Sequence, residues 1–230
     1  MMCACKNGHL EVVDFYLDNG TPIDLVCDWN ENTLLHCECQ RGHADIALDL
    51  LERGADANAA NKETIRPIIY ASTSGSLEVV KRLAEMSPDL HKRKLKYLPI
   101  VQAAAHGHLD IVNYFYSKGV DLLVKERGGP TALLAACNSN HPKVVAFLLS
   151  KIFSSKTKPN FNDLFDQIIR SEHPGFVVQL MEYAADVFDG DESIRTRTYI
   201  SLIKHKDFES LKKCFREEDR KTFKLPCEDE

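Results

Sequence analysis

The sequence has no long apolar run, no excess of positive charge and only one tryptophan. A membrane-spanning helix needs about 18 consecutive apolar residues, and a secretory signal needs an apolar core that the start, MMCACKNGH, lacks. We therefore expect an intracellular protein, cytoplasmic with the nucleus not excluded, that does not insert into a membrane. The net charge of -5 disfavours a general nucleic-acid binder, because phosphate binding needs clustered positive charge.

What the sequence does contain is a repeated two-residue corner, in which glycine or asparagine precedes histidine or serine. After each corner, apolar residues recur three to four positions apart, which predicts amphipathic helices, whereas strands would alternate. Fainter copies of the pattern begin near His173 and Lys206. The five clear corners, spaced by 32 to 34 residues, are Gly8-His9, Gly42-His43, Gly75-Ser76, Gly107-His108 and Asn140-His141.

The stretch from Asn32 to Asn58 contains one complete unit of the repeat. Thr33 precedes a first short helix, Gly42 interrupts the apolar pattern, and Gly54 ends a second helix. Two helices of about nine residues cannot bury their apolar faces against each other alone, so the unit predicts neighbours of the same design.

These residues resemble the ankyrin-repeat family, whose units of about 33 residues open the first helix with T-P-L-H-x-A. The matching segments begin at Thr33 (TLLHCE), Arg66 (RPIIYA), Leu98 (LPIVQA) and Thr131 (TALLAA), although none carries the complete signature. The resemblance implies an all-α solenoid of about seven helix-turn-helix units joined by β-hairpin-like turns. The units are expected near residues 1–24, 28–58, 61–91, 93–123, 126–152, 158–188 and 192–220, followed by an acidic, fraying tail at 221–230.

Three parts of this array depart from the pattern. Residues 154–162 are polar and interrupted by proline, which predicts a longer hairpin or an insertion. The last two units are degenerate. Met1 falls inside the expected first helix, so we expect either a fragment of a longer array or another element that covers this edge.

Two groups of residues could be mistaken for a metal-binding site or a phosphate-binding loop. His36, Cys37 and Cys39 suggest zinc, but residues two apart on a helix point in nearly opposite directions, so the cysteines are expected to pack in the core. Gly128 to Pro130 is expected to be a hairpin tip and not a phosphate loop. The corner histidines lack a recurring nucleophile or carboxylate, and we expect them to shape turns through local hydrogen bonds.

The resemblance implies a non-catalytic module, without a cofactor, that binds another protein or peptide on its concave face. The candidate anchors are the single tryptophan, Trp29, with Tyr70 and Tyr97, because large aromatics dominate many interfaces. For Trp29 the alternative is packing on its neighbouring hairpin. The expected outward residues are Trp29, Asn30, Asn32, Lys62, Ile65, Lys94, Tyr97 and Arg127 on the tips, with Gln40, Arg41, Tyr70, Gln102 and His106 on the first helices.

Two further features leave alternatives open. The basic run from Lys92 to Lys96 is either a solvated surface or a strip that steers an acidic peptide into the groove. Asn58 lies in a context similar to the one that asparaginyl hydroxylases recognise in this family, although the family also uses this asparagine to brace the hairpin. The chain could also act as a targeting arm for a catalytic or ubiquitin-ligase partner, or as a structural spacer in a longer array.

Overall fold

The structure, a computed structural model, describes residues 9–87, 98–126 and 129–154, together with residues 166, 168, 173, 176, 179 and 180. The described segments fold into α-helices, and the isolated backbone bridges are Val26 with Thr33 and Lys125 with Thr131. The expected all-α repeat fold is therefore confirmed. None of the described helices is long and apolar enough to cross a membrane.

The chain divides into two compact units, residues 1–144 and 145–230. In the second unit the described structure is the end of one helix and six further residues, so the predicted repeats at 158–188 and 192–220 and the tail at 221–230 fall almost wholly outside it. The helices are α2 (Leu10–Asp18), α3 (Leu34–Arg41), α4 (Ala44–Glu52), α5 (Pro67–Ser74), α6 (Leu77–Met86), α7 (Pro99–Ala105), α8 (Leu109–Ser117), α9 (Ala132–Asn138) and α10 (Pro142–Ser154).

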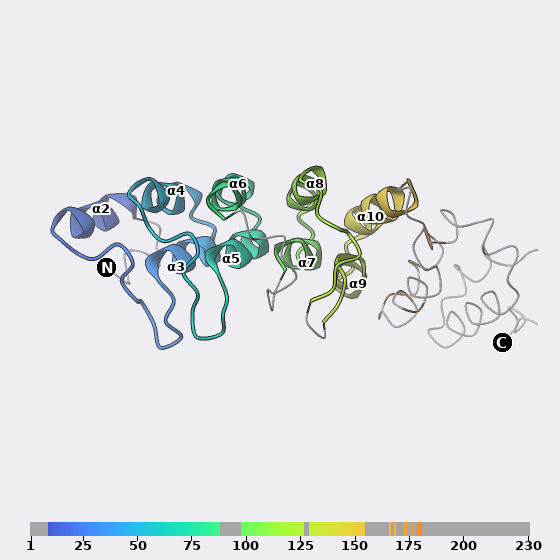
Figure 1. Cartoon of the computed structure of the whole chain (residues 1–230), viewed down its shortest axis with the longest axis horizontal. Coiled ribbons are helices and arrows are strands. Elements are labelled where there is room, and N and C mark those ends of the chain that lie inside the picture. Colours follow the sequence, from blue (N-terminus) through green and yellow to red (C-terminus); the bar gives the residue numbers. More distant parts are fainter. Residues whose placement is uncertain are drawn as a thin grey trace, which may run out of the picture. The chain divides into compact units, whose positions relative to one another are not determined.

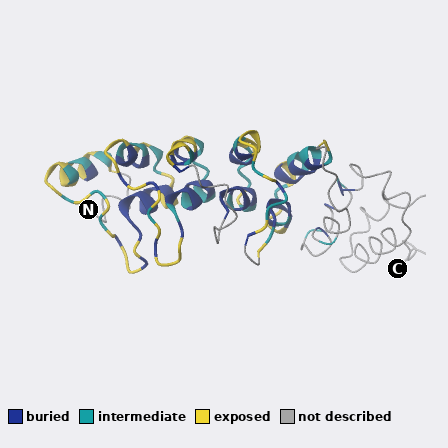
Figure 2. Ribbon diagram, in the orientation of Figure 1, coloured by how far each residue is buried: buried dark blue, intermediate teal, exposed yellow. Residues whose placement is uncertain are grey.

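Within the first unit the helices form two rows (Figure 1). Helices α3, α5, α7 and α9 contact one another in that order, and so do α2, α4, α6 and α8. The buried sides of the two rows face each other, as Figure 2 shows, and Leu50, Val79, Leu83 and Ile111 there are fully buried. Each pair buries its apolar stripes against its neighbours, which is why the unit needs copies of itself.

Local signals explain where the first-row helices begin and end. Thr131 caps α9 by accepting a hydrogen bond at its hydroxyl from the Leu134 amide, at 3.2 Å, and prolines at the first position start α5 and α7. Gly42 and Gly75 end α3 and α5 with φ of 77° and 84°, in the left-handed region that favours glycine.

The corner histidines reach further than expected. His108 Nε2 donates to the carbonyl of Thr73 at 2.9 Å, and His141 Nε2 donates to the carbonyl of Ala105 at 3.0 Å. The prediction of purely local bonds is wrong for these two, because each ring lies over the corner of the preceding repeat. At Gly75 a Cβ would lie 2.5 Å from the His108 ring, so this contact requires glycine.

The described cysteines that align within their repeats are core residues, as predicted. Cys39 is 1% exposed and Cys137 is fully buried, and burial raises the pKa of the Cys137 thiol to about 12. Among the described residues no group of three histidine, cysteine or acidic side chains is arranged to hold a metal ion.

Candidate partner-binding surface

The tip between α2 and α3 is shaped by Asp28. One of its carboxylate oxygens accepts hydrogen bonds from the backbone amides of Asn30 and Asn32, both at 3.0 Å, and the other accepts from the Asn32 amide group at 2.8 Å. Burial opposes ionisation of Asp28, but these bonds outweigh it, and the pKa of the carboxyl lies below its usual value. The tip is therefore held in one conformation, with Glu31 at a φ of 61°.

The next tip repeats this design with Asn61 in place of the aspartate. Its side-chain oxygen accepts from the amides of Glu63 and Ile65, at 3.0 and 2.9 Å. The same side chain donates to the Asn32 side-chain oxygen at 2.8 Å, and the Lys62 backbone amide donates to the Asn30 carbonyl at 3.0 Å. The two tips thus form one hydrogen-bonded layer.

This layer corrects part of the sequence-based surface. Asn30, Asn32 and Ile65 are buried, with 9%, 6% and 9% of their surface exposed, so the prediction that they point outward is wrong. Asn32 is turned inward because its amide links the two tips, and Ile65 because the hydrogen-bonded turn places its side chain against the core. A single sequence does not show which tip asparagine has a partner one repeat away.

Trp29 points outward as predicted, with 83% of its surface exposed. Its alternative placement, packed on the next hairpin, does not hold, although its backbone carbonyl does accept a 2.6 Å hydrogen bond from Lys62 Nζ. Lys62 also pairs with Glu31 at 3.5 Å. Val26, at the base of the same tip, is 50% exposed, and the sequence reasoning missed it because an isolated valine gives no signal of exposure.

The predicted helix residues differ in how available they are. Gln40, Arg41 and His106 are exposed. Tyr70 is half-buried, and its hydroxyl lies 3.5 Å from the amide nitrogen of Asn61. Gln102 is half-buried as well, and it donates to the carboxylate of Glu126 at 2.9 Å. Lys94, Tyr97 and Arg127, with the rest of the basic run, lie outside the described residues.

His36 connects helix α3 to the second tip. Its Nδ1 accepts from the backbone amide of Thr33 at 3.2 Å, and its Nε2 donates to the carbonyl of Ile65 at 3.1 Å. This pair of contacts requires the neutral ring with its proton on Nε2. Burial lowers the pKa of His36 below its ordinary value of 6.5, so the bridge between the repeats is kept in the neutral form.

Helix α3 also carries a buried carboxylate that the sequence analysis did not single out. Glu38 is fully buried, and its Oε2 lies 2.7 Å from His43 Nδ1. Its Oε1 has no hydrogen-bond partner, although Arg41 lies 3.9 Å away. The neighbouring repeats carry Ala71, Ala103 and Ala136 at the equivalent position, so Glu38 replaces a small apolar residue, and the repeat spacing gives no sign of its role.

Asn58 makes several of the contacts expected of a bracing side chain. Its side-chain oxygen accepts from Ser87 Oγ at 2.6 Å and lies 3.4 Å from Arg66 Nη1, and its amide is 3.5 Å from the Met86 carbonyl. These contacts tie the end of its own repeat to the end of α6. Asn58 therefore braces the end of its repeat against the next one.

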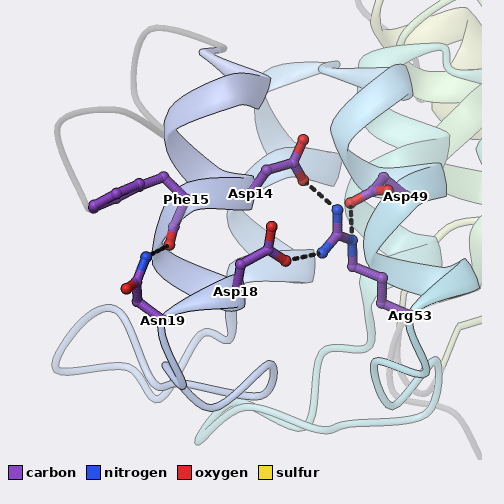
Figure 3. Close-up of polar contacts among 6 residues, drawn as sticks. All are labelled: Asp14, Phe15, Asp18, Asn19, Asp49 and Arg53. Atoms are coloured by element: carbon purple, nitrogen blue, oxygen red, sulfur yellow. Dashed lines mark hydrogen bonds and ion pairs between the residues drawn. The ribbon is translucent and has the colours of Figure 1, made fainter.

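The second row has its own polar link, which the sequence analysis also missed (Figure 3). Arg53, after α4, contacts Asp14 at 2.7 Å and Asp18 at 2.9 Å on α2, and Asp49 at 2.8 Å. The hydrogen bond to Asp18 contributes most to raising the pKa of Arg53. The cluster holds the first described helix to α4, and Phe15 beside it is 63% exposed.

Comparison with known proteins gives several partial likenesses. The chain is 33% identical over 146 residues to a transient receptor potential cation channel subfamily A member 1 homolog from Caenorhabditis elegans, which is 63% of this chain and 12% of that protein. It is 30% identical over 197 residues to an ankyrin repeat and KH domain-containing protein of Caenorhabditis briggsae, 71% of this chain and 7% of that protein. A probable E3 ubiquitin-protein ligase, XBOS33, from Oryza sativa is 38% identical over 85 residues, 36% of this chain and 16% of that protein.

The chain thus spans less than a fifth of the length of each of these relatives. The shared part is the repeat array: residues 1–94 and 100–191 match the family description "Ankyrin repeats (3 copies)". The matched segments cover more than half of the chain and include every described helix except the first residue of α7, Pro99. The chain belongs to the ankyrin-repeat family.

Proposed function

We propose that this chain binds a partner protein or peptide through the surface around Trp29, Gln40 and Arg41. Ankyrin repeats are generally non-catalytic protein-interaction modules. The observation that carries the proposal is the 83% exposure of Trp29 on a tip whose backbone is fixed by hydrogen bonds to Asp28. An aromatic side chain on a rigid support loses little conformational freedom on binding, which favours it as an anchor.

The test is an affinity purification with the full chain as bait, comparing the natural sequence with Trp29→Ala. We expect the variant to lose the specific partner, with an affinity reduced by about 30-fold or more if the side chain contributes the ~2 kcal/mol of an interface anchor. Phe15→Ala is the matched control, because Phe15 is also an exposed aromatic but lies on α2 in the other row. Equal loss with both variants, or with neither, would contradict the proposal.

A second candidate is an adaptor arm that recruits a substrate to a catalytic or ubiquitin-ligase partner. The likeness to a probable E3 ubiquitin-protein ligase supports it. This candidate predicts that the purified complex contains ligase activity that the Trp29→Ala complex lacks. A spacer role within a longer array predicts instead that neither Trp29→Ala nor Tyr97→Ala changes what is recovered.

The partner proposed for this surface is acidic. The support is the basic run Lys92–Lys96, with the exposed Lys125 about one repeat later in the sequence; the charge of Lys62 is partly balanced by Glu31. Affinity for the partner should fall steeply between low and physiological salt. Salt-independent binding would contradict the proposal that the partner is acidic. Nucleic acids and small molecules are not among the predicted partners.

Two further predictions concern the modification of Asn58 and the location of the protein in the cell. Co-expression with an asparaginyl hydroxylase should add one oxygen, about 16 Da, to the Asn58 peptide; an unchanged mass would exclude Asn58 as a substrate of that enzyme. The expected location in the cytoplasm or nucleus stays a prediction that imaging of the tagged chain would test.

A further inference from the structure

Helix α2 exposes two apolar residues at positions that the next three repeats keep buried. Val12 and Tyr16 lie three and seven residues after the corner residue His9, and they are 39% and 38% exposed. At the same distances after the later corners, each residue is at most 2% exposed. These residues are Ile46 and Leu50 in α4, Val79 and Leu83 in α6, and Ile111 and Phe115 in α8. Helix α2 therefore has the packing residues of an internal repeat in an exposed position.

The exposed pair lies on the side of α2 that points away from α4. Asp14 and Asp18 mark the side toward α4, because both contact Arg53. Residues two apart on a helix point in nearly opposite directions, so Val12 and Tyr16 face away from that contact. Helix α2 is the end of its row in Figure 1, and none of the described helices packs on this open side.

The Trp29 tip belongs to the same edge of the array. Trp29 follows Asp28 as Lys62 follows Asn61, so the two residues hold the same position in their tips. From this position Lys62 reaches back to the preceding tip, where its Nζ donates to the Trp29 carbonyl at 2.6 Å. Trp29 thus occupies the position that contacts a preceding neighbour, and its side chain is 83% exposed.

The charged groups near this edge are balanced within the chain. Asp28 accepts hydrogen bonds from the amides of its own tip, and Glu31 pairs with Lys62 at 3.5 Å. Arg53 holds the two aspartates of α2 on the other side of the helix. Two copies of this edge would therefore bring apolar side chains together without strong repulsion between like charges.

We propose that this edge, which consists of the open side of α2 and the Trp29 tip, binds the same edge of a second copy of the chain. The contact continues an interface that the array already contains, because helices of the outer row pack side by side, α2 with α4 and α4 with α6. A contact between two identical edges is two-fold symmetric, so the association closes at a dimer and each residue is used twice.

The dimer would regulate the surface proposed for partner binding. Trp29 is buried in the dimer, so a second copy and a partner protein compete for the same side chain. A chain at high concentration would then hold its partner less tightly than a dilute one. The dimer itself is inferred from the buried positions of the later repeats and does not depend on the identity of the partner.

The mass of the natural chain in solution tests the proposal without any other protein. Light scattering of the full chain between about 1 and 100 µM should show a mass that rises with concentration toward about 52 kDa, twice the 26.0 kDa of one chain. Tyr16→Lys should weaken the dimer by about 100-fold, because it buries an unpaired charge that costs about 10-fold in each copy. Trp29→Ala should weaken it by at least about 10-fold.

Phe15→Lys is the matched control. Phe15 is next to Tyr16 and is 63% exposed, but the residues at its position in α4 and α6 are Asp49 and Arg82, which are polar. The outward side of the row therefore has no apolar packing position there. Phe15→Lys adds the same charge to the same helix, and it should dimerise like the natural chain.

A mass of 26.0 kDa at every concentration would overturn the proposal and leave this edge to another occupant. Equal effects of Tyr16→Lys and Phe15→Lys, or species larger than a dimer, would overturn it as well. If Tyr16→Lys does not fold by circular dichroism, hydrogen exchange of the natural chain decides: raising the concentration should protect the amides of α2 and leave those of α6 unchanged. An equal change in both helices, or none, would contradict the dimer.

The outcome is separable from that of partner binding. A monomeric chain leaves the affinity purification with Trp29→Ala unaffected, because that experiment measures recovery of another protein. Failure to recover a partner leaves the mass measurement unaffected, because only the chain itself is present.

Discussion

Asn61 provides the sharpest test of how the tips are held together. Asn61→Ala removes a donor to the Asn32 oxygen at 2.8 Å and an acceptor for the amides of Glu63 and Ile65 at 3.0 and 2.9 Å. A net hydrogen bond contributes about 1 kcal/mol, and a buried group left unpaired costs about 1–3 kcal/mol. Asn61 is 4% exposed, so the free energy of unfolding should fall by about 2–4 kcal/mol.

Two measurements check this value. Urea unfolding followed by circular dichroism gives the loss for the chain, and hydrogen exchange at the Ile65 amide gives the loss at the tip itself. The local measurement is needed because a repeat array can open one repeat at a time. The Ile65 amide should lose most of its protection in the variant, since Asn61 is its hydrogen-bond acceptor.

Asn30→Ala is the matched control. Asn30 has the same side chain and similar burial on the neighbouring tip, but its hydrogen bonds in the network are made by its backbone. Asn30→Ala should lower the free energy of unfolding by less than about 1 kcal/mol. A similar loss for both asparagines would refute the reasoning, and so would strict additivity of Asn32→Ala with Asn61→Ala, which should couple by at least about 0.5 kcal/mol.

Three other changes test the remaining contacts. Gly75→Ala should lower the free energy of unfolding by about 1–3 kcal/mol, because alanine is strained at the positive φ of this position and its Cβ would meet the His108 ring; unchanged urea unfolding would contradict this. Burial lowers the pKa of His36, so the unfolded state binds the proton more readily, and the free energy of unfolding should be highest above pH 6.5 and decline as the pH falls below it. In His36→Gln the urea midpoint of unfolding should change less between pH 7.5 and 5.5 than it does in the natural chain. An equal change in both chains would refute the assignment. Arg53→Gln should lower the thermal midpoint in low salt, with a difference that shrinks as salt is added, whereas Arg82→Gln, which breaks a single exposed pair with its own helix, should change little.

The repeat and its helices could be predicted because their signals are local and periodic. The apolar spacing in residues 44–52 and the glycine corners depend only on neighbouring residues, and these segments form α4 and the helix ends as expected. The same holds for Cys39, whose position in the repeat placed it in the core.

The polar network could not be predicted in the same way. Whether Asn32 points outward depends on Asn61, 29 residues away, and whether Arg53 finds three carboxylates depends on α2 in the preceding repeat. These contacts are set by how one repeat lies on the next, and repeat spacing alone does not give that orientation. The exposed Trp29 was predictable because the repeat pattern contains no core position for it.

The rings of His108 and His141 fix how each corner lies on the preceding corner, and they do not fix the length of chain between the two corners. They reach carbonyls 35 and 36 residues earlier, with nearly equal bond lengths of 2.9 and 3.0 Å. One extra residue is therefore absorbed between the corners without disturbing them. Lengthening a flexible loop costs little free energy, so the tips are where inserted peptides or grafted binding loops should be tolerated, whereas a single deletion inside a helix would move a ring off its corner. The same contacts that join the repeats thus mark where the chain can be redesigned.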